Sequence, residues 1–132
     1  MKKIIISLCL LCDAGVGHAE NWVKQVDTPH LIYMDFDSLR YKDGLVSFLE
    51  KEAFPSRVST RLPPTYQQQI SFNQAVSLQI LNCKLLTMTR IETRYLDVTG
   101  EVVATQQFDG SSWGPVRADS WLNGALKNIC PP

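Results

Sequence analysis

Two aspartates and a histidine form the one cluster in this sequence whose residue types resemble a catalytic or metal site. Asp35 and Asp37 are two positions apart, so on a strand both carboxylates would lie on one side and could hold a hard cation. His30 is close to them and is the only histidine after the first 19 residues. An aspartate where a strand meets a turn is equally common. We interpret this cluster as structural and expect no metal and no cofactor.

Nucleophilic catalysis would need a reactive side chain that His30 could activate. The sequence has no G-x-S-x-G motif, no glycine-rich phosphate loop and no cysteine–histidine cluster with metal-ligand spacing. A small hydrolase is the remote alternative, and we expect the protein not to be an enzyme.

A first group of candidate binding residues lies in the stretch 53–74. This stretch has three prolines, three consecutive glutamines and little apolar periodicity, so it is predicted to be a loop that contributes little to the core. Exposed loops often carry recognition. The candidate binding residues in this loop are Arg57, Arg61 and Tyr66.

A second group of candidate binding residues is a basic strip of Lys84, Arg90 and Arg94. These residues and Glu92 have even numbers, so on a flat strand they would share one wet face. Such a strip could contact an acidic partner. The alternative is an ordinary solvated sheet face.

Strands are the elements expected to position most of these side chains. Short strands are predicted over residues 22–26, 31–36 and 45–49, and the last two would form a hairpin across a polar connection at 37–44. The central stretch 75–108 also has the pattern of a hairpin. Its turn, Asp97-Val-Thr-Gly100, fits a type I turn closed by a glycine bulge.

The apolar residues of the central stretch change parity. Val76 and Leu78 have even numbers, whereas Leu81, Cys83 and Leu85 have odd ones. A single flat strand cannot place both sets on one face. Either a bulge lies near residues 80–82, or both faces of the sheet are covered there.

A C-terminal helix is predicted over residues 118–130. Asp119 or Ser120 could cap it, and apolar residues recur behind the cap at helical spacing. Strands followed by a single helix indicate the α+β class, with an antiparallel β-sheet packed by a C-terminal α-helix.

The first 19 residues have the pattern of a bacterial secretory signal, with Lys2 and Lys3 before a short apolar run and a cut after Ala19. We expect residues 1–19 to be a signal peptide and 20–132 to be a single domain. No lipobox precedes a cysteine, so we predict a product without a lipid anchor, in the periplasm, on the outer cell surface or secreted. No later apolar run is long enough for a transmembrane segment.

Charge excludes one class of partner. Removal of residues 1–19 takes Lys2, Lys3 and Asp13 from 13 basic and 13 acidic residues, which leaves a net charge of −1. A nucleic-acid-binding domain would carry a clear basic excess. We therefore expect a protein ligand and no nucleic acid.

Two cysteines remain after removal of the signal, Cys83 and Cys130. An even pair in an oxidising compartment predicts one disulfide. On the chain-entropy model, closing a loop of this length would stabilise the fold by about 4 kcal/mol.

The order of several short motifs resembles the surface-adhesin protein E-like family of Gram-negative bacteria. The similarity covers nearly all of the chain after the signal, with Phe48 standing where the family often has Trp. The matching pieces are Trp22, Tyr33-Met-Asp35 with Ser38, Gly44-Leu-Val46, Leu81-Asn-Cys83, Tyr95, Gly100-Glu-Val-Val103, Trp113, Ser120 and Cys130.

The resemblance implies an exported, non-enzymatic domain with a Cys83–Cys130 bridge. It also implies an adhesin-like function, because the named member of the family is an outer-surface adhesin that binds host vitronectin, laminin and plasminogen. The expected partners are host extracellular-matrix or serum proteins, with a homodimer as a further option. The alternative is a periplasmic accessory or inhibitor protein that binds another bacterial protein. No binding residue is transferred from the family.

Overall fold

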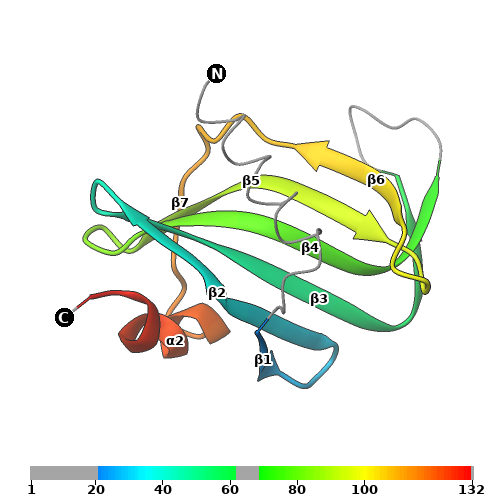
Figure 1. The fold of residues 1–132 in the computed structure, drawn as a ribbon, viewed down its shortest axis with the longest axis horizontal. Helices are drawn as coiled ribbons and strands as arrows, with labels where there is room; N and C mark the ends of the chain where they lie inside the picture. Colours follow the sequence, from blue (N-terminus) through cyan, green and yellow to red (C-terminus); the bar gives the residue numbers. More distant parts are fainter. Residues whose placement is uncertain (1–20, 62–68, 132) are drawn as a thin grey trace.

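Most of the chain folds into one antiparallel sheet. The structure, a computed structural model, describes residues 21–61 and 69–131. Six strands lie side by side in chain order, and a short seventh strand pairs with β5 (Figure 1). The elements are β1 (Trp22–Val26), β2 (Leu31–Lys42), β3 (Leu45–Thr60), β4 (Ile70–Asn82), β5 (Thr87–Leu96), β6 (Val102–Gln107), β7 (Gly114–Pro115) and the helix α2 (Trp121–Ile129). The predicted α+β class, with an antiparallel sheet and a C-terminal helix, is confirmed.

The β2–β3 hairpin is also confirmed, but its connection is much shorter than predicted. β2 continues to Lys42, and only Asp43 and Gly44 form the turn, with φ of 54° and 79°. Two positive φ values are typical of the tight hairpin turns that match strand twist. The polar residues that suggested a connection at 37–44 lie instead in an irregular part of β2, where the register against β3 shifts between Asp35 and Arg40.

The predicted turn between β5 and β6 has the expected geometry. The Gly100 N–H donates to the Asp97 carbonyl at 3.0 Å, and Gly100 has a φ of 87°. The left-handed conformation at this position is the one that glycine adopts most easily.

The predicted loop at 53–74 is wrong for most of its length, since β3 continues to Thr60 and β4 begins at Ile70. Pro55 lies where the β3–β4 register shifts, between Ala53 and Val58. A proline is tolerated at such a bulge because its missing N–H is not needed for the ladder. The irregular composition therefore marked a bulged hairpin.

The parity change along β4 reflects cover on both of its faces, since β4 pairs with β3 without a register shift from Gln74 to Asn82. Leu78 pairs with Glu92 and Gln79 pairs with Arg90, so β5 carries Ile91 as an extra residue at this point. This bulge is on β5 and not in β4 near residues 80–82, where the first of the two alternatives placed it. Leu78 and Gln79 are also 2% and 1% exposed, so both faces of β4 are covered here, as the second alternative required.

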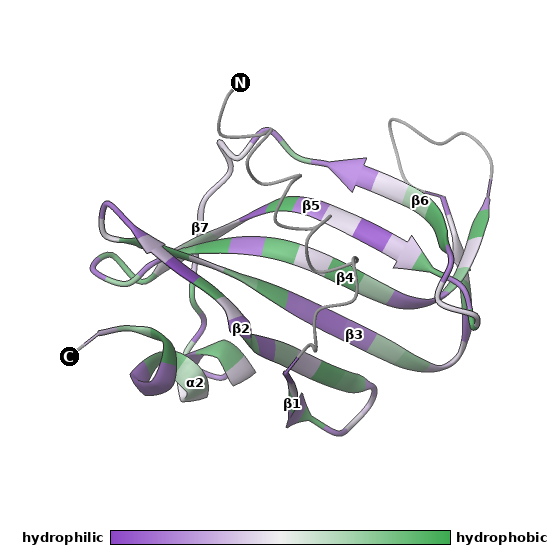
Figure 2. Cartoon of the chain, in the orientation of Figure 1, coloured by the Kyte–Doolittle hydropathy of each residue, from purple (hydrophilic) through white to green (hydrophobic). Residues whose placement is uncertain are grey.

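The larger hydrophobic cluster joins one face of the sheet to α2. Buried residues of α2 belong to the same cluster as buried residues of β2, β3 and β4, which defines the helix-bearing face of the sheet. The members are Met34, Val46, Phe48, Leu81, Leu122, Ala125 and Ile129. A smaller cluster around Leu49 and Leu78 lies on the opposite face. Figure 2 shows the alternation of hydrophobic and hydrophilic residues along the strands.

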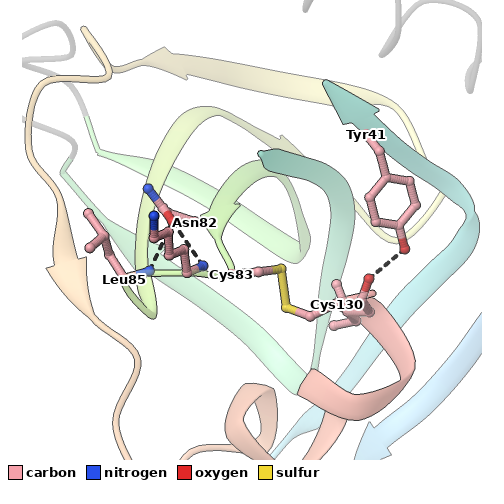
Figure 3. Close-up of a disulfide and its surroundings, with 7 residues drawn as sticks. Tyr41, Asn82, Cys83, Leu85 and Cys130 are labelled. Carbon is pink, nitrogen blue, oxygen red and sulfur yellow. Dashed lines mark hydrogen bonds between the residues drawn. A yellow bond between two sulfur atoms is a disulfide. The ribbon is translucent and has the colours of Figure 1, made fainter. Parts of the chain in front are cut away.

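Local bonds fix both ends of α2. Ser120 caps the helix, because its Oγ accepts a hydrogen bond from the Asn123 N–H at 3.3 Å. Cys130 follows the last helical residue and is bonded to Cys83, with Cα atoms 5.8 Å apart (Figure 3). The predicted disulfide is confirmed. Tyr41 Oη donates to the Ile129 carbonyl at 2.5 Å, which ties the same end of α2 to β2.

The predicted signal peptide lies outside the described residues. Within the described parts of the chain, no helix has the length and apolar character that a membrane crossing requires.

Candidate binding faces

A two-stranded arm extends from the sheet where the loop was predicted. Pairing of β2 with β3 ends at Ala53, and pairing of β4 with β5 ends at Gln74, whereas β3 and β4 stay paired as far as Thr60 and Ile70. We call the described residues of this extension, 55–61 and 69–73, the arm. The arm and α2 lie at opposite ends of the sheet (Figure 1).

The arm presents two of the predicted binding residues to solvent. Arg57 and Arg61 are both exposed, and no acidic residue occurs among the described residues of the arm. The hydroxyls of Ser59 and Ser71 are 2.8 Å apart and link its two strands. The third candidate from this stretch, Tyr66, lies outside the described residues.

The base of the arm is part of an aromatic cluster. Phe72 is only 5% exposed. Its ring centroid lies 4.7 Å from that of Tyr95 and 5.7 Å from that of Phe54. Phe54 in turn lies 5.0 Å from the His30 ring. The expectation that this stretch contributes little to the core is therefore wrong at its base.

The predicted basic strip does not form. The extra residue Ile91 places Arg90 beside Gln79 on the helix-bearing face, whereas Arg94 pairs with Val76 and lies on the opposite face. Lys84 is exposed in the turn after β4. Uninterrupted alternation along the strand would place Arg90 and Arg94 on one face, and a one-residue bulge reverses that alternation.

Arg94 is engaged within the fold. Its Nε lies 3.3 Å from Oε2 of Glu92, and Glu92 is only 2% exposed. The Gln107 side-chain amide donates to the other Glu92 oxygen at 3.1 Å. A buried carboxylate requires such partners, so Arg94 has a structural role that reduces its availability to a ligand.

A polar band crosses the helix-bearing face next to the hydrophobic cluster. In register, Phe48 pairs with Gln79, and Glu50 pairs with Ser77. The Ser77 and Thr93 hydroxyls are 2.8 Å apart. We define the polar band by the side chains Glu50, Glu52, Ser77, Gln79, Arg90 and Thr93. The polar band was not predicted from the sequence, although Glu50 and Glu52 occupy the same alternating positions on β3 as Phe48 and Phe54.

Burial dominates the electrostatics of Glu50, which is 6% exposed. Desolvation raises the pKa of its carboxyl from 4.5 to about 7, and nearby Glu52 adds to the rise. Arg90 opposes the rise, as do hydrogen bonds from the Gln79 and Trp121 side chains.

The cluster of His30, Asp35 and Asp37 is separated in the structure. His30 Nε2 lies 2.6 Å from Glu52 Oε2, on the polar band side. Asp35 is 4% exposed, and its Oδ1 accepts hydrogen bonds from the backbone N–H groups of Asn21 and Asp37 at 3.1 and 3.0 Å. The Asp35 carboxylate therefore fixes backbone, as the structural interpretation predicted. No group of three or more metal-ligating side chains forms among residues 21–61 and 69–131.

A surface pocket of about 430 Å³ lies beside Arg90, lined also by Thr89 and the segment 108–112. One wall is organised by Asp109, whose carboxylate accepts hydrogen bonds from the Ser111 N–H and hydroxyl at 2.9 and 2.7 Å. Those bonds lower the pKa of Asp109. Arg90 therefore belongs both to the polar band and to the lining of this pocket.

Solved structures of protein E from Haemophilus influenzae are similar to this chain. One has a TM-score of 0.58 and 17% identity, over 86% of both chains. Its selenomethionine form has a TM-score of 0.57 and 16% identity, over 86% of this chain and 88% of that one. Protein E from non-typeable Haemophilus influenzae gives 0.56 and 16%, over 87% and 78% respectively.

No protein-family model and no curated protein matches the chain. At the identities found, the structural similarity concerns the fold and does not transfer a function. The resemblance to the protein E-like family drawn from the order of the sequence motifs is confirmed at this level: the chain has the fold of Haemophilus influenzae protein E.

Proposed function

We propose that this chain is an exported, non-enzymatic binding protein that acts as an adhesin towards host extracellular-matrix or serum proteins. The fold of protein E and the sequence resemblance to a family with an outer-surface adhesin support this proposal. The pairing of His30 with Glu52 and Phe54, rather than with a nucleophile, supports binding over catalysis.

The observation that carries the proposal is the arm. It extends beyond both neighbouring strands and exposes Arg57 and Arg61 on a backbone held by cross-strand pairing. Two cations on a preordered ribbon, with no acid among its described residues, favour a partner with an acidic patch. Such contacts speed association and weaken as salt screens them.

The first prediction concerns the two exposed arginines. Arg57→Glu combined with Arg61→Glu should reduce the affinity for immobilised vitronectin or laminin by at least tenfold, since each substitution replaces attraction by repulsion. Surface plasmon resonance at about 0.05 and 0.5 M salt should also show that the parent binds more weakly as the Debye length shortens.

The matched control is Lys84→Glu with Lys127→Glu, which makes the same charge change at two exposed lysines away from the arm. It should keep the parent affinity. Equal losses in both variants would indicate a nonspecific charge effect. Loss only in the lysine variant would move the binding surface away from the arm.

Cellular location separates the adhesin from the periplasmic accessory or inhibitor protein. An adhesin must be reached by an added protease on intact cells. An accessory protein should be cleaved only after the outer membrane is permeabilised, and that result would favour the alternative.

A second copy of the chain is a further candidate partner, because exposed Val102 and Val103 lie on β6, the last strand in the sheet order. Sedimentation of the purified chain tests for the dimer.

A further inference from the structure

Gln79 places an unpaired hydrogen-bond acceptor in the centre of the sheet. The residue is 1% exposed, and its Oε1 has no hydrogen-bond partner in the part of the chain that the structure describes. The side chain of the same residue hydrogen-bonds to Glu50. A buried acceptor without a donor costs about 1–3 kcal/mol, so a native protein rarely leaves one.

The protonation state of Glu50 decides whether this acceptor can be satisfied. An ionised carboxylate only accepts hydrogen bonds, so it can pair with the Gln79 N–H but offers nothing to Oε1. A neutral carboxylic acid has one O–H donor and one carbonyl acceptor. It is therefore complementary to a carboxamide and can form two hydrogen bonds with it.

We propose that Glu50 is a neutral carboxylic acid in the folded protein, that its O–H donates to Gln79 Oε1, and that loss of this proton at higher pH weakens the fold. The proposal goes beyond the binding function, since it concerns a pH-sensitive element on the helix-bearing face of the sheet.

The groups that face Glu50 favour the neutral form. Across the register are Ser77 on β4 and Met34 on β2, neither of which is charged. The helix contributes the Trp121 indole, and β5 contributes Arg90. On its own strand, Glu52 repels a negative charge, although His30 lies against Glu52. Arg90 is exposed, so water screens its attraction and burial prevails.

The direction of the pH effect follows from the raised pKa. Folded Glu50 has a pKa of about 7 against 4.5 for the ordinary side chain, so the folded chain holds more protons between these values. Its contribution is fully present below pH 4.5 and is lost as pH rises through about 7. At one decade per pH unit, the unfolding equilibrium constant should rise by at most roughly 300-fold.

The start of α2 should respond first. The Trp121 indole hydrogen-bonds to Glu50 and packs edge-on against Phe48, with ring centroids 6.4 Å apart. Ionisation adds a solvated charge at this junction. Water that enters to solvate the carboxylate would loosen the contact between the first helical turn and β3.

The test is urea unfolding of the parent and Glu50→Gln at several values between about pH 5 and 8.5. Glutamine has nearly the shape of the neutral acid, keeps a donor for Gln79 Oε1 and does not titrate in this range. Relative to the variant, the parent should lose stability as pH rises from about 5 towards 7, and the difference should level off above about 7. Glu101→Gln, which changes an exposed carboxyl in the turn before β6, should retain the parent's pH dependence.

Two outcomes would overturn the proposal: parallel pH profiles for the parent and Glu50→Gln, or a Glu50 carboxyl that titrates near 4.5. Carbon-13 NMR of the glutamate carboxyl carbons in the parent measures the second directly. It therefore remains decisive even if Glu50→Gln does not fold.

Discussion

Asp35 and Ser38 hold the irregular part of β2 against β3. Ser38 Oγ donates to the Asp35 carbonyl at 2.6 Å and accepts from the Leu49 N–H at 2.8 Å. Asn82 similarly closes the turn after β4, since its Oδ1 accepts from the N–H groups of Lys84 and Leu85, both at 3.0 Å (Figure 3). These side chains replace strand-to-strand bonds where the ladder is interrupted.

The motifs that carried the family resemblance thus include residues with structural roles. Asp35, Ser38 and Asn82 satisfy backbone groups, Ser120 caps α2, and Gly100 adopts a left-handed conformation. This explains why short motifs could predict the fold while 16–17% identity leaves the partner open. The residues proposed to bind, Arg57 and Arg61, are not part of those motifs.

A prediction at this scale concerns the Asp35 carboxylate. Asp35→Ala leaves the N–H groups of Asn21 and Asp37 without their acceptor, so we expect unfolding to become easier by about 2 kcal/mol. Urea denaturation followed by tryptophan fluorescence measures the change. Asp37→Ala, at an exposed position two residues away, should change stability by less than about 0.5 kcal/mol. Similar losses in both would contradict a specific role for the Asp35 carboxylate.

At the scale of elements, bulges determine which side chains meet. Alternation along β5 would have put Arg90 and Arg94 together, and one extra residue, Ile91, puts them on opposite faces. The parity change around Leu78 and Leu81 signalled an irregularity or double coverage. It could not show that the extra residue belongs to the neighbouring strand, since that depends on pairing between residues distant in sequence.

Proline had a similar effect on the prediction for β3. By composition Pro55 favours a loop, yet it occupies a register shift, and Val58–Thr60 pair again beyond it. Local composition cannot distinguish these cases because both lack a ladder N–H at the proline.

The short strands at 22–26, 31–36 and 45–49 were found in the right places because their residues alternate regularly, although two of them continue further than predicted.

The base of the arm provides the prediction for this scale. Phe72→Ala removes a 5% exposed ring from contact with Phe54 and Tyr95, so we expect a loss of about 3 kcal/mol in stability. Thermal and urea unfolding both report it. Leu85→Ala, which truncates a side chain that is 67% exposed, should change stability by less than about 0.5 kcal/mol. An equally small effect at Phe72 would restore the view that this stretch is dispensable to the core.

At the scale of the whole molecule, the sequence predicted the class, the C-terminal helix and the disulfide. Each of these predictions depends on only a few residues. The disulfide follows from a pair of cysteines, and the helix follows from a capping residue and apolar residues at helical spacing. The polar band could not be predicted. Glu50, Gln79 and Trp121 come from three separate elements and meet only once the strand register and the position of α2 are known.

The disulfide provides the prediction for the whole molecule. Cys83→Ala with Cys130→Ala should destabilise the fold by up to about 4 kcal/mol, because the bridge closes a loop with a sequence separation of 47. Urea unfolding of the oxidised parent and the variant measures this difference. The parent under reducing conditions should lose a similar amount. A variant as stable as the oxidised parent would show that the bridge does not stabilise the fold by restricting the unfolded chain.

The same bridge also sets the path of a mechanical load. Cys130 follows α2 directly, and Cys83 follows β4, an interior strand of the sheet. Tension applied beyond Cys130 therefore passes through a covalent bond into β4 without first unwinding the nine-residue helix. Extension of the oxidised chain from this end therefore loads β4 directly, whereas extension of the reduced chain begins by peeling α2 from the sheet. Oxidation thus converts a helix that would yield early under force into one that the pull bypasses.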